Sequence, residues 1–185
     1  MKTLLHCCCG PCTAGSLPAF LERGREVTGW YFNPNIHPYK EFTARRDSFI
    51  QYMQAVNCEY LVENEYPLED WLLVQAPLAK ERQARCGNCY RLRLEPAAQK
   101  AAELGYDAFS TTLLVSPYQD HQLLIEVGQE MALRYGVSFD YIDLRPGFRD
   151  GQNQAREMGL YMQKYCGCIY SEKERYVKKK KKAAE

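Results

Sequence analysis

Apolar residues in this chain fall into short continuous runs separated by longer segments with a helical spacing. The runs typical of buried strands are Lys2–His6, Glu26–Phe32, Tyr60–Val62, Ala108–Leu114 and Phe139–Leu144. Strands that alternate with helices favour a mostly parallel sheet with helices on both faces. The pattern therefore predicts a doubly wound α/β fold.

The segments between these runs carry apolar residues three or four positions apart, as a helix with one buried face requires. The predicted helices are Ser16–Arg23, Tyr39–Asn57, Leu68–Val74, Tyr90–Leu104, Asp120–Tyr135 and Gln152–Lys164. Leu68–Val74 is short enough to be a loop instead. Pro96 is expected to interrupt its helix, because proline removes a backbone hydrogen bond.

Ligands in folds of this class bind beyond the carboxyl ends of the parallel strands. Four segments fall on that rim in the predicted arrangement: Cys7–Cys12, Asn33–Pro38, Thr111–Gln119 and Arg145–Arg149. The functional site is therefore expected where these loops meet.

The composition is that of an ordinary globular protein, with 185 residues, 46% of them hydrophobic, and a net charge of +1. The length suits a single α/β catalytic domain over residues 1–177, followed by a basic, disordered tail over residues 178–185. The lysine run Lys178–Lys182 is typical of a solvated tail, and an arm that binds RNA is the alternative. Because the net charge is near zero, a polyanion must be bound by local patches.

No stretch resembles a secretory signal or approaches the ~20 apolar residues of a membrane span. We therefore expect a cytoplasmic protein with no membrane partner. Because the cytoplasm keeps thiols reduced, the nine cysteines indicate metal ligands or redox catalysts rather than a disulfide scaffold.

The cysteines form three groups and one isolated residue. The groups are the cluster within Cys7–Cys12, the C-x-x-C pair Cys86 and Cys89, and the C-x-C pair Cys166 and Cys168. Cys58 stands alone and fits a core position. Packing does not require several cysteines in one short stretch, so the first group favours thiolate chemistry.

Iron–sulfur ligation explains these groups better than zinc does. One zinc ion uses four ligands, and adjacent residues such as Cys8 and Cys9 are expected to chelate one ion poorly. In a [4Fe–4S] cluster each thiolate binds a different iron, and Cys8, Cys9, Cys86 and Cys89 supply a set of four. Zinc and metal-free thiol redox chemistry stay open as alternatives.

The C-x-C pair has two interpretations. Cys166 and Cys168 can close into a small strained disulfide, the labile and redox-active kind. The pair can also hold a second metal ion together with Cys12. Both interpretations place a second redox element near the cluster.

Five motifs carry a resemblance to a known family: Lys2–Cys12, Tyr31–Pro38, Cys86–Leu94, Ser110–His121 and Tyr161–Ser171. Together they resemble the cobalamin-independent iron–sulfur epoxyqueuosine reductases. The resemblance implies a fold similar to the adenine nucleotide α-hydrolase-like (HUP) domains. It also implies an oxidoreductase that reduces epoxyqueuosine to queuosine, with two electrons, at the wobble position of a tRNA anticodon.

The resemblance also implies roles for individual cysteines. The [4Fe–4S] ligands would be Cys8, Cys9, Cys86 and Cys89, and the redox-active disulfide pair would be Cys166 and Cys168. Cys12 is the expected ligand of an additional iron ion.

Two positions depart from the family's pattern. Gly10 stands where alanine is expected, and we interpret this change as conservative. Cys7 is a thiol at a position that is usually not cysteine, so it has no implied role.

Removal of the epoxide oxygen needs two electrons and either a proton donor or a Lewis acid, and an open iron can serve as the Lewis acid. Tyr118 and His121 are the expected catalytic acids or substrate-positioning residues, and His37 and Tyr31 are further candidates. A structural hydrogen bond is an equally good interpretation of each of these side chains.

The implied partners are a tRNA anticodon stem-loop and an electron donor that the sequence does not identify. An extruded loop base can stack on aromatic side chains, and the chain has 14 tyrosines. The predicted phosphate contacts are Arg45, Arg46, Arg91, Arg93 and Lys164.

Two other classes of function compete with this one. The first is a zinc-stabilised module that binds RNA or protein without redox activity. The second is an ATP-dependent tRNA thiolase or pyrophosphatase. It would need a phosphate-binding loop rich in glycine and serine after the first strand, where this chain has Cys7–Cys12.

Overall fold

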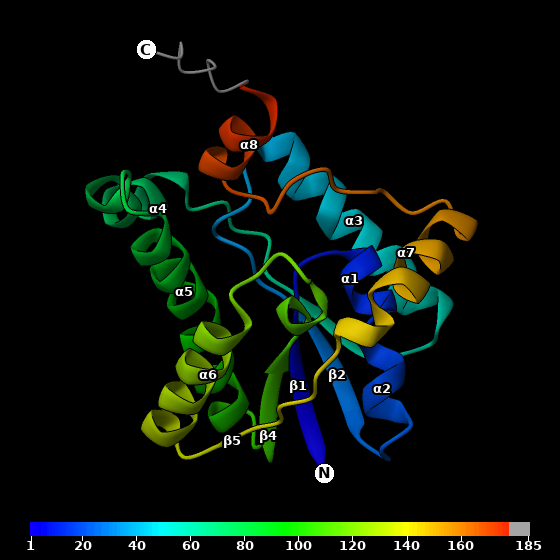
Figure 1. Ribbon diagram of the computed structural model, residues 1–185. Coiled ribbons are helices and arrows are strands. Elements are labelled where there is room, and N and C mark those ends of the chain that lie inside the picture. The colour runs from blue at the N-terminus through cyan, green and yellow to red at the C-terminus, as the bar shows by residue number, and fades with distance from the viewer. Residues whose placement is uncertain (178–185) are drawn as a thin grey trace, which may run out of the picture.

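Five parallel strands form the centre of the protein in the computed structural model, which describes residues 1–177 (Figure 1). The strands are β1 (Lys2–Cys7), β2 (Glu26–Tyr31), β3 (Tyr60–Val62), β4 (Ala108–Thr111) and β5 (Ser138–Phe139). Their order in the sheet is β3-β2-β1-β4-β5, and all four pairings are parallel. The predicted parallel α/β class is therefore confirmed, whereas the predicted tail lies outside the described residues.

The central strand β1 is buried because neighbouring strands flank it and helices cover both of its faces. Leu4, Leu5 and Cys7 have no solvent exposure, as expected of a strand in the middle of a parallel sheet. In the register, Leu5 stands opposite Gly29 of β2 and Ser110 of β4. The carboxyl end of β1 therefore lies at the middle of the sheet's rim.

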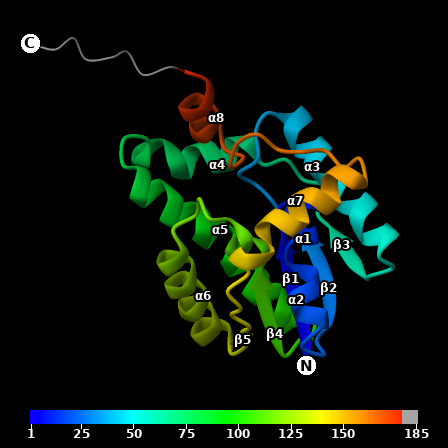
Figure 2. The ribbon, with the colours of Figure 1, turned by 45° about the vertical axis from the view of Figure 1, so that its right-hand side comes forward.

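Helices cover the sheet on two sides. Figures 1 and 2 show α5 (Arg82–Glu103) and α6 (His121–Tyr135) on one side. The other side carries α1 (Gly10–Ala14), α2 (Leu17–Leu21), α3 (Tyr39–Ala55) and α7 (Phe148–Glu157). Two further helices, α4 (Leu68–Gln75) and α8 (Ile169–Tyr176), lie beyond the carboxyl ends of the strands (Figure 1). None of the helices described in residues 1–177 combines the length and the apolar character that a membrane crossing needs.

Several predicted boundaries are wrong. The C-x-x-C motif lies inside α5, which begins at Arg82 and continues through Pro96. The last strand is confined to Ser138–Phe139, and β4 gives way to a 3-10 turn over Thr112–Val115. The expected helix Gln152–Lys164 is instead α7, which ends at Glu157, followed by irregular chain up to α8.

Gly10, the first residue of α1, lets this helix approach α3 closely. A Cβ atom at this position would lie 2.5 Å from the backbone oxygen of Ser48 and 2.9 Å from its carbonyl carbon. Real Cβ atoms do not approach backbone atoms so closely. Replacing Gly10 by alanine is therefore not conservative in this chain, and that part of the sequence interpretation is wrong.

We predict that Gly10→Ala lowers the free energy of unfolding by about 1–3 kcal/mol, because α1 and α3 must separate to admit the methyl group. Urea denaturation of the metal-free protein measures this loss. Gly87→Ala in α5 is the control, since its Cβ would meet only the flexible ends of Leu123 at 3.3 Å and Arg91 at 3.9 Å. Equal stability of Gly10→Ala and the unsubstituted protein would contradict the close contact.

Candidate active site

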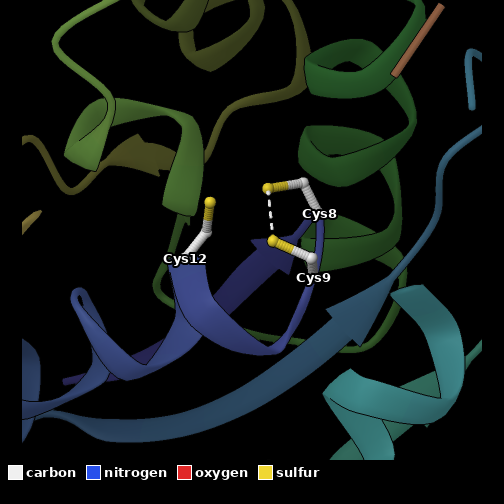
Figure 3. A group of neighbouring side chains, drawn as sticks. All are labelled: Cys8, Cys9 and Cys12. Atoms are coloured by element: carbon white, nitrogen blue, oxygen red, sulfur yellow. Dashed lines mark hydrogen bonds between the residues drawn. The ribbon is translucent and has the colours of Figure 1, made fainter. Parts of the chain in front are cut away.

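Three thiols gather in the turn that follows β1 (Figure 3). The sulfur atoms of Cys8, Cys9 and Cys12 all lie within 4.8 Å of one another, and those of Cys8 and Cys9 are 3.7 Å apart. Cys9 is the residue that precedes α1, and Cys12 lies within that short helix. The change from strand to helix therefore turns three nearby side chains toward one point.

The fourth thiol of this stretch has a different place. Cys7 ends β1, is fully buried, and its Sγ donates a hydrogen bond to the carbonyl of Leu5 at 3.2 Å. Burial raises the pKa of this thiol. Cys7 is therefore a core residue, which settles the position that the sequence left without a role.

The three cysteine groups meet at one cleft of about 1520 Å³. Its lining includes Cys8 and Cys12 from the first group, together with Cys86, Cys89, Cys166 and Cys168. Cys86 and Cys89 are almost one turn apart on α5 and so face the same side. Cys58, in contrast, hydrogen-bonds to the Val27 carbonyl and does not line the cleft.

The sulfur spacing bears on which metal the first group can hold. Tetrahedral zinc with Zn–S bonds of about 2.3 Å places its sulfurs about 3.8 Å apart, close to the 3.7 Å between Cys8 and Cys9. The adjacency of these two cysteines therefore does not disfavour a single ion, contrary to the sequence argument. The three thiols are close enough to hold a metal ion, and their spacing does not decide which type of metal centre they would form.

Two fully buried arginines lie beside the thiols. Arg45 and Arg93 are each 1% exposed. Arg93 donates to the backbone carbonyl of Cys89 at 2.9 Å and to its Sγ at 3.3 Å. Among the ion pairs of the described residues, Arg45 pairs with Glu41 and none involves Arg93.

A buried charge is unfavourable unless an opposite charge lies beside it. Thiolates are the natural counter-charges in this cleft, and metal binding is what removes their protons. Burial raises the pKa of Cys89 to about 12, so this thiol stays protonated near neutral pH without a metal. The donor set and the buried arginines therefore fit an anionic metal–thiolate centre.

The thiols of Cys8, Cys9 and Cys12 differ in pKa although they lie close together. Hydrogen bonds from Cys12 and Cys9 lower the pKa of Cys8 well below its ordinary value, whereas burial raises that of Cys9. Thr112 supports Cys8, since its hydroxyl donates to the sulfur at 3.6 Å and accepts from the Cys8 amide at 3.2 Å. Cys8 is therefore the thiol of this group that loses its proton most readily.

Several residues that contact the thiols were not singled out from the sequence. Thr112 touches Cys8, Gln163 donates to the sulfur of Cys12 at 3.4 Å, and Gln119 donates to that of Cys166 at 3.4 Å. All three stand in the motifs quoted above, so their motif membership was the available signal.

The C-x-C pair contributes two free thiols to the cleft, one exposed and one half-buried. Cys166 is the exposed member. Cys168 precedes α8, and its sulfur accepts a hydrogen bond from the amide of Ser171 at 3.4 Å. The pair is therefore placed beside the other thiols, from the opposite end of the chain.

Of the four proposed acids, the structure brings only Tyr118 to the cleft. Tyr118 is 79% exposed and packs edge-on against Phe148. His121 begins α6 next to the lining residue Asp120, but it hydrogen-bonds to the hydroxyl of Tyr141 at 3.0 Å and does not itself line the cleft. A catalytic role of His121 therefore stays a prediction without support from this geometry.

The other two candidates are in structural hydrogen bonds. The Tyr31 hydroxyl donates to the Phe42 carbonyl at 2.9 Å, and Nδ1 of His37 lies 3.1 Å from the Tyr66 hydroxyl. Both residues are buried and neither lines the cleft.

Only one of the five predicted phosphate contacts is an exposed residue of the cleft. Arg45 and Arg93 are buried, so that part of the prediction is wrong. Arg46 and Arg91 pair with acidic neighbours and do not line the cleft. Lys164 does line it, together with exposed basic residues that the sequence did not single out: Arg82, Arg149, Arg156 and Arg175.

A match to a known family covers nearly the whole chain. The family model described as epoxyqueuosine reductase QueH matches residues 3–174. A protein of that name from Dehalococcoides mccartyi is 36% identical over 177 residues, which are 96% of this chain and 96% of the relative. The one from Thermotoga maritima is 31% identical over 178 residues, covering 93% of this chain and 91% of the relative.

A solved structure supports the fold alone. The predicted subunit of a tRNA methyltransferase from Methanocaldococcus jannaschii superimposes with a TM-score of 0.53 at 11% sequence identity. The match covers 86% of this chain and 89% of the other.

His6, next to the thiol turn, provides a pH test of the site's core. Its Nε2 lies 2.9 Å from the Phe32 carbonyl, which can only accept, so Nε2 carries the proton and Nδ1 accepts from the Thr111 hydroxyl at 2.9 Å. Burial, followed by the nearby charge of Arg93, lowers the pKa of His6 from 6.5 to about 4.

We predict that this neutral histidine makes stability fall as the pH falls from about 6.5 to 4. In this range the unfolded chain binds a proton at His6 that the folded chain does not, so the free energy of unfolding decreases by about 3 kcal/mol. Denaturation curves of the metal-free protein at several pH values measure the slope. His6→Gln should lose this contribution, and an unchanged slope in the variant would contradict it.

Proposed function

This chain belongs to the epoxyqueuosine reductase QueH family, and from this premise we propose that it reduces epoxyqueuosine to queuosine in the anticodon of tRNA by means of a [4Fe–4S] cluster. The observation that carries the proposal is the meeting of three cysteine groups in one cleft beside two buried arginines. The proposal places the enzyme in the cytoplasm, where thiols stay reduced.

We assign the cluster ligands as Cys8, Cys9, Cys86 and Cys89, and Cys12 as the ligand of an additional iron. Cys8, Cys9 and Cys12 lie close together, and Cys86 and Cys89 face the same cleft from α5. A four-thiolate cluster carries net negative charge, which suits the buried guanidinium groups of Arg45 and Arg93.

Reduction of an epoxide to an alkene releases its oxygen as water and consumes two electrons and two protons. A cluster held by Cys8, Cys9, Cys86 and Cys89 would supply electrons singly, and an additional iron held by Cys12 would act as a Lewis acid on the departing oxygen. The dithiol of Cys166 and Cys168 can supply all of these electrons and protons, because its oxidation to a disulfide releases two electrons and two protons. A separate electron donor must then reduce this disulfide.

The cleft's rim suits an RNA loop. Exposed basic side chains line it, and the acidic lining residues are Asp120 and Glu174. The exposed ring of Tyr118 at the rim can stack on an extruded base or give a proton to the departing oxygen. The zinc-stabilised binding module is the less favoured function, because the matched family consists of reductases.

We predict that replacing a cluster ligand and replacing a cysteine of the C-x-C pair have different effects on iron content and activity. Cys89→Ser should lose both the cluster and the activity, because it removes a ligand. Cys168→Ser should keep the cluster and lose repeated turnover, because the dithiol can no longer cycle. Iron and acid-labile sulfide are measured after anaerobic reconstitution, and activity on tRNA that carries epoxyqueuosine.

Cys58→Ser, which removes a thiol outside the cleft, is the matched control and should retain both properties. Full reductase activity in a Cys89→Ser protein that contains no iron would refute the proposal.

A further inference from the structure

Arg45 of α3 is a buried side chain that helps to tie the C-x-C segment to the body of the protein, alongside the hydrogen bonds of this segment to the backbone of His37. Its Nη1 donates to the carbonyl of Cys166 at 2.9 Å, and its Nη2 donates to that of Tyr165 at 2.8 Å. The guanidinium also lies over the ring of Tyr165, 5.4 Å from its centre. Arg45 therefore binds the backbone of the first cysteine of the pair and of the residue before it.

Arg45 is itself held in a fixed orientation. Its Nε donates to Glu41, one turn earlier on α3, at 2.7 Å, and the other carboxylate oxygen of Glu41 accepts from the hydroxyl of Tyr161. Arg45 is 1% exposed and Glu41 is 7% exposed. Because all three nitrogens of the guanidinium donate to fixed acceptors, this fork has one orientation.

The residue between the two cysteines fits closely against the same region. Gly167 has a φ of +141°, which L side chains rarely adopt, and a Cβ there would lie 3.1 Å from Ile36 and 3.4 Å from Nη1 of Arg45. Its carbonyl accepts from the amide of His37 at 2.8 Å. The segment is therefore seated between α3 and the loop after β2.

Arg45 also belongs to the cleft wall that contains Cys8 and Cys12. Arg45 thus lines the same cleft as two N-terminal thiols and donates to the backbone of the C-terminal pair, 121 residues later in the chain.

We propose that Arg45 is a positioning residue that holds the Cys166/Cys168 pair at a working distance from the N-terminal thiols. Its loss releases the segment around the pair while the sheet and its helices remain folded. This inference rests on the proposed redox function of the pair, and it assigns to Arg45 no contact with the RNA.

Arg45→Gln and Arg45→Lys test the proposal, with amide hydrogen exchange followed by mass spectrometry on the full chain. In Arg45→Gln we expect faster exchange in the peptide that covers residues 161–171 and unchanged exchange in the peptide that covers β1. Lysine keeps a positive charge beside Glu41 and can reach one carbonyl. The exchange rate of the 161–171 peptide in Arg45→Lys should therefore lie between the rates in Arg45→Gln and in the unsubstituted protein.

Kinetics on the same variants give the second readout. We expect kcat to fall at least about tenfold in Arg45→Gln, because the variant loses both charge-assisted hydrogen bonds to the segment's carbonyls and each alone is worth about that factor. KM for the tRNA should stay unchanged, because Arg45 is buried. Arg25→Gln is the matched control: it breaks the partly buried Arg25–Asp140 ion pair near the opposite end of β2, outside the cleft, and should leave both readouts unchanged.

Faster exchange in every peptide, β1 included, would overturn the proposal, since Arg45 would then support the whole fold. Unchanged exchange over residues 161–171, or an unchanged kcat in Arg45→Gln, would also overturn it. An inactive unsubstituted enzyme would count against the proposed function, and the exchange measurement would still decide whether Arg45 holds the segment.

Discussion

Buried positive charge is the constraint on which this cleft depends. Arg93 is fully buried and donates to the sulfur of Cys89, and Arg45 is fully buried with Glu41 as its acidic partner. An uncompensated buried ion costs several kcal/mol, more than the roughly 1 kcal/mol of a typical hydrogen bond. Arg93 has no acidic partner among the ion pairs of the described residues, so it favours a thiolate beside it. A metal–thiolate centre would supply that charge without leaving a buried thiol of high pKa.

The fold makes this centre possible by collecting distant parts of the chain at one rim. The turn after β1 brings the first thiols, α5 brings Cys86 and Cys89, and the irregular chain after α7 brings Cys166 and Cys168. Parallel strands leave their carboxyl ends on one side, so loops from different units meet there. The C-terminal part has no strand to place it, and it depends on side-chain contacts such as those of Arg45.

Much of the architecture could be predicted from the sequence, because alternating apolar runs and helical segments report directly on a parallel sheet. Tertiary packing explains the failures. Pro96 does not end α5, since the fully buried face of Leu94, Ala97 and Ala101 outweighs a cost of about 3 kcal/mol. Gly10 looked replaceable by alanine, but the closeness of Ser48 is visible only once α1 and α3 are placed.

The site was predictable at the level of its cysteine groups and less so at the level of single roles. The grouping of thiols pointed to a cluster with a second redox element near it, and members of all three groups do line one cleft. Arg45 and Arg93 looked like surface phosphate contacts, because charge on a predicted helix usually faces solvent. Their acceptors include backbone carbonyls, and for Arg45 these lie 120 and 121 residues away, which no local pattern encodes.

The central claim is that the thiols of this cleft hold an iron–sulfur cluster, and its most direct test is a joint assay of metal and sulfide. The protein is purified without oxygen, and iron, zinc and acid-labile sulfide are measured per chain. We predict at least about four irons and about four sulfides, as the [4Fe–4S] composition requires. About one zinc per chain with no sulfide would contradict the claim.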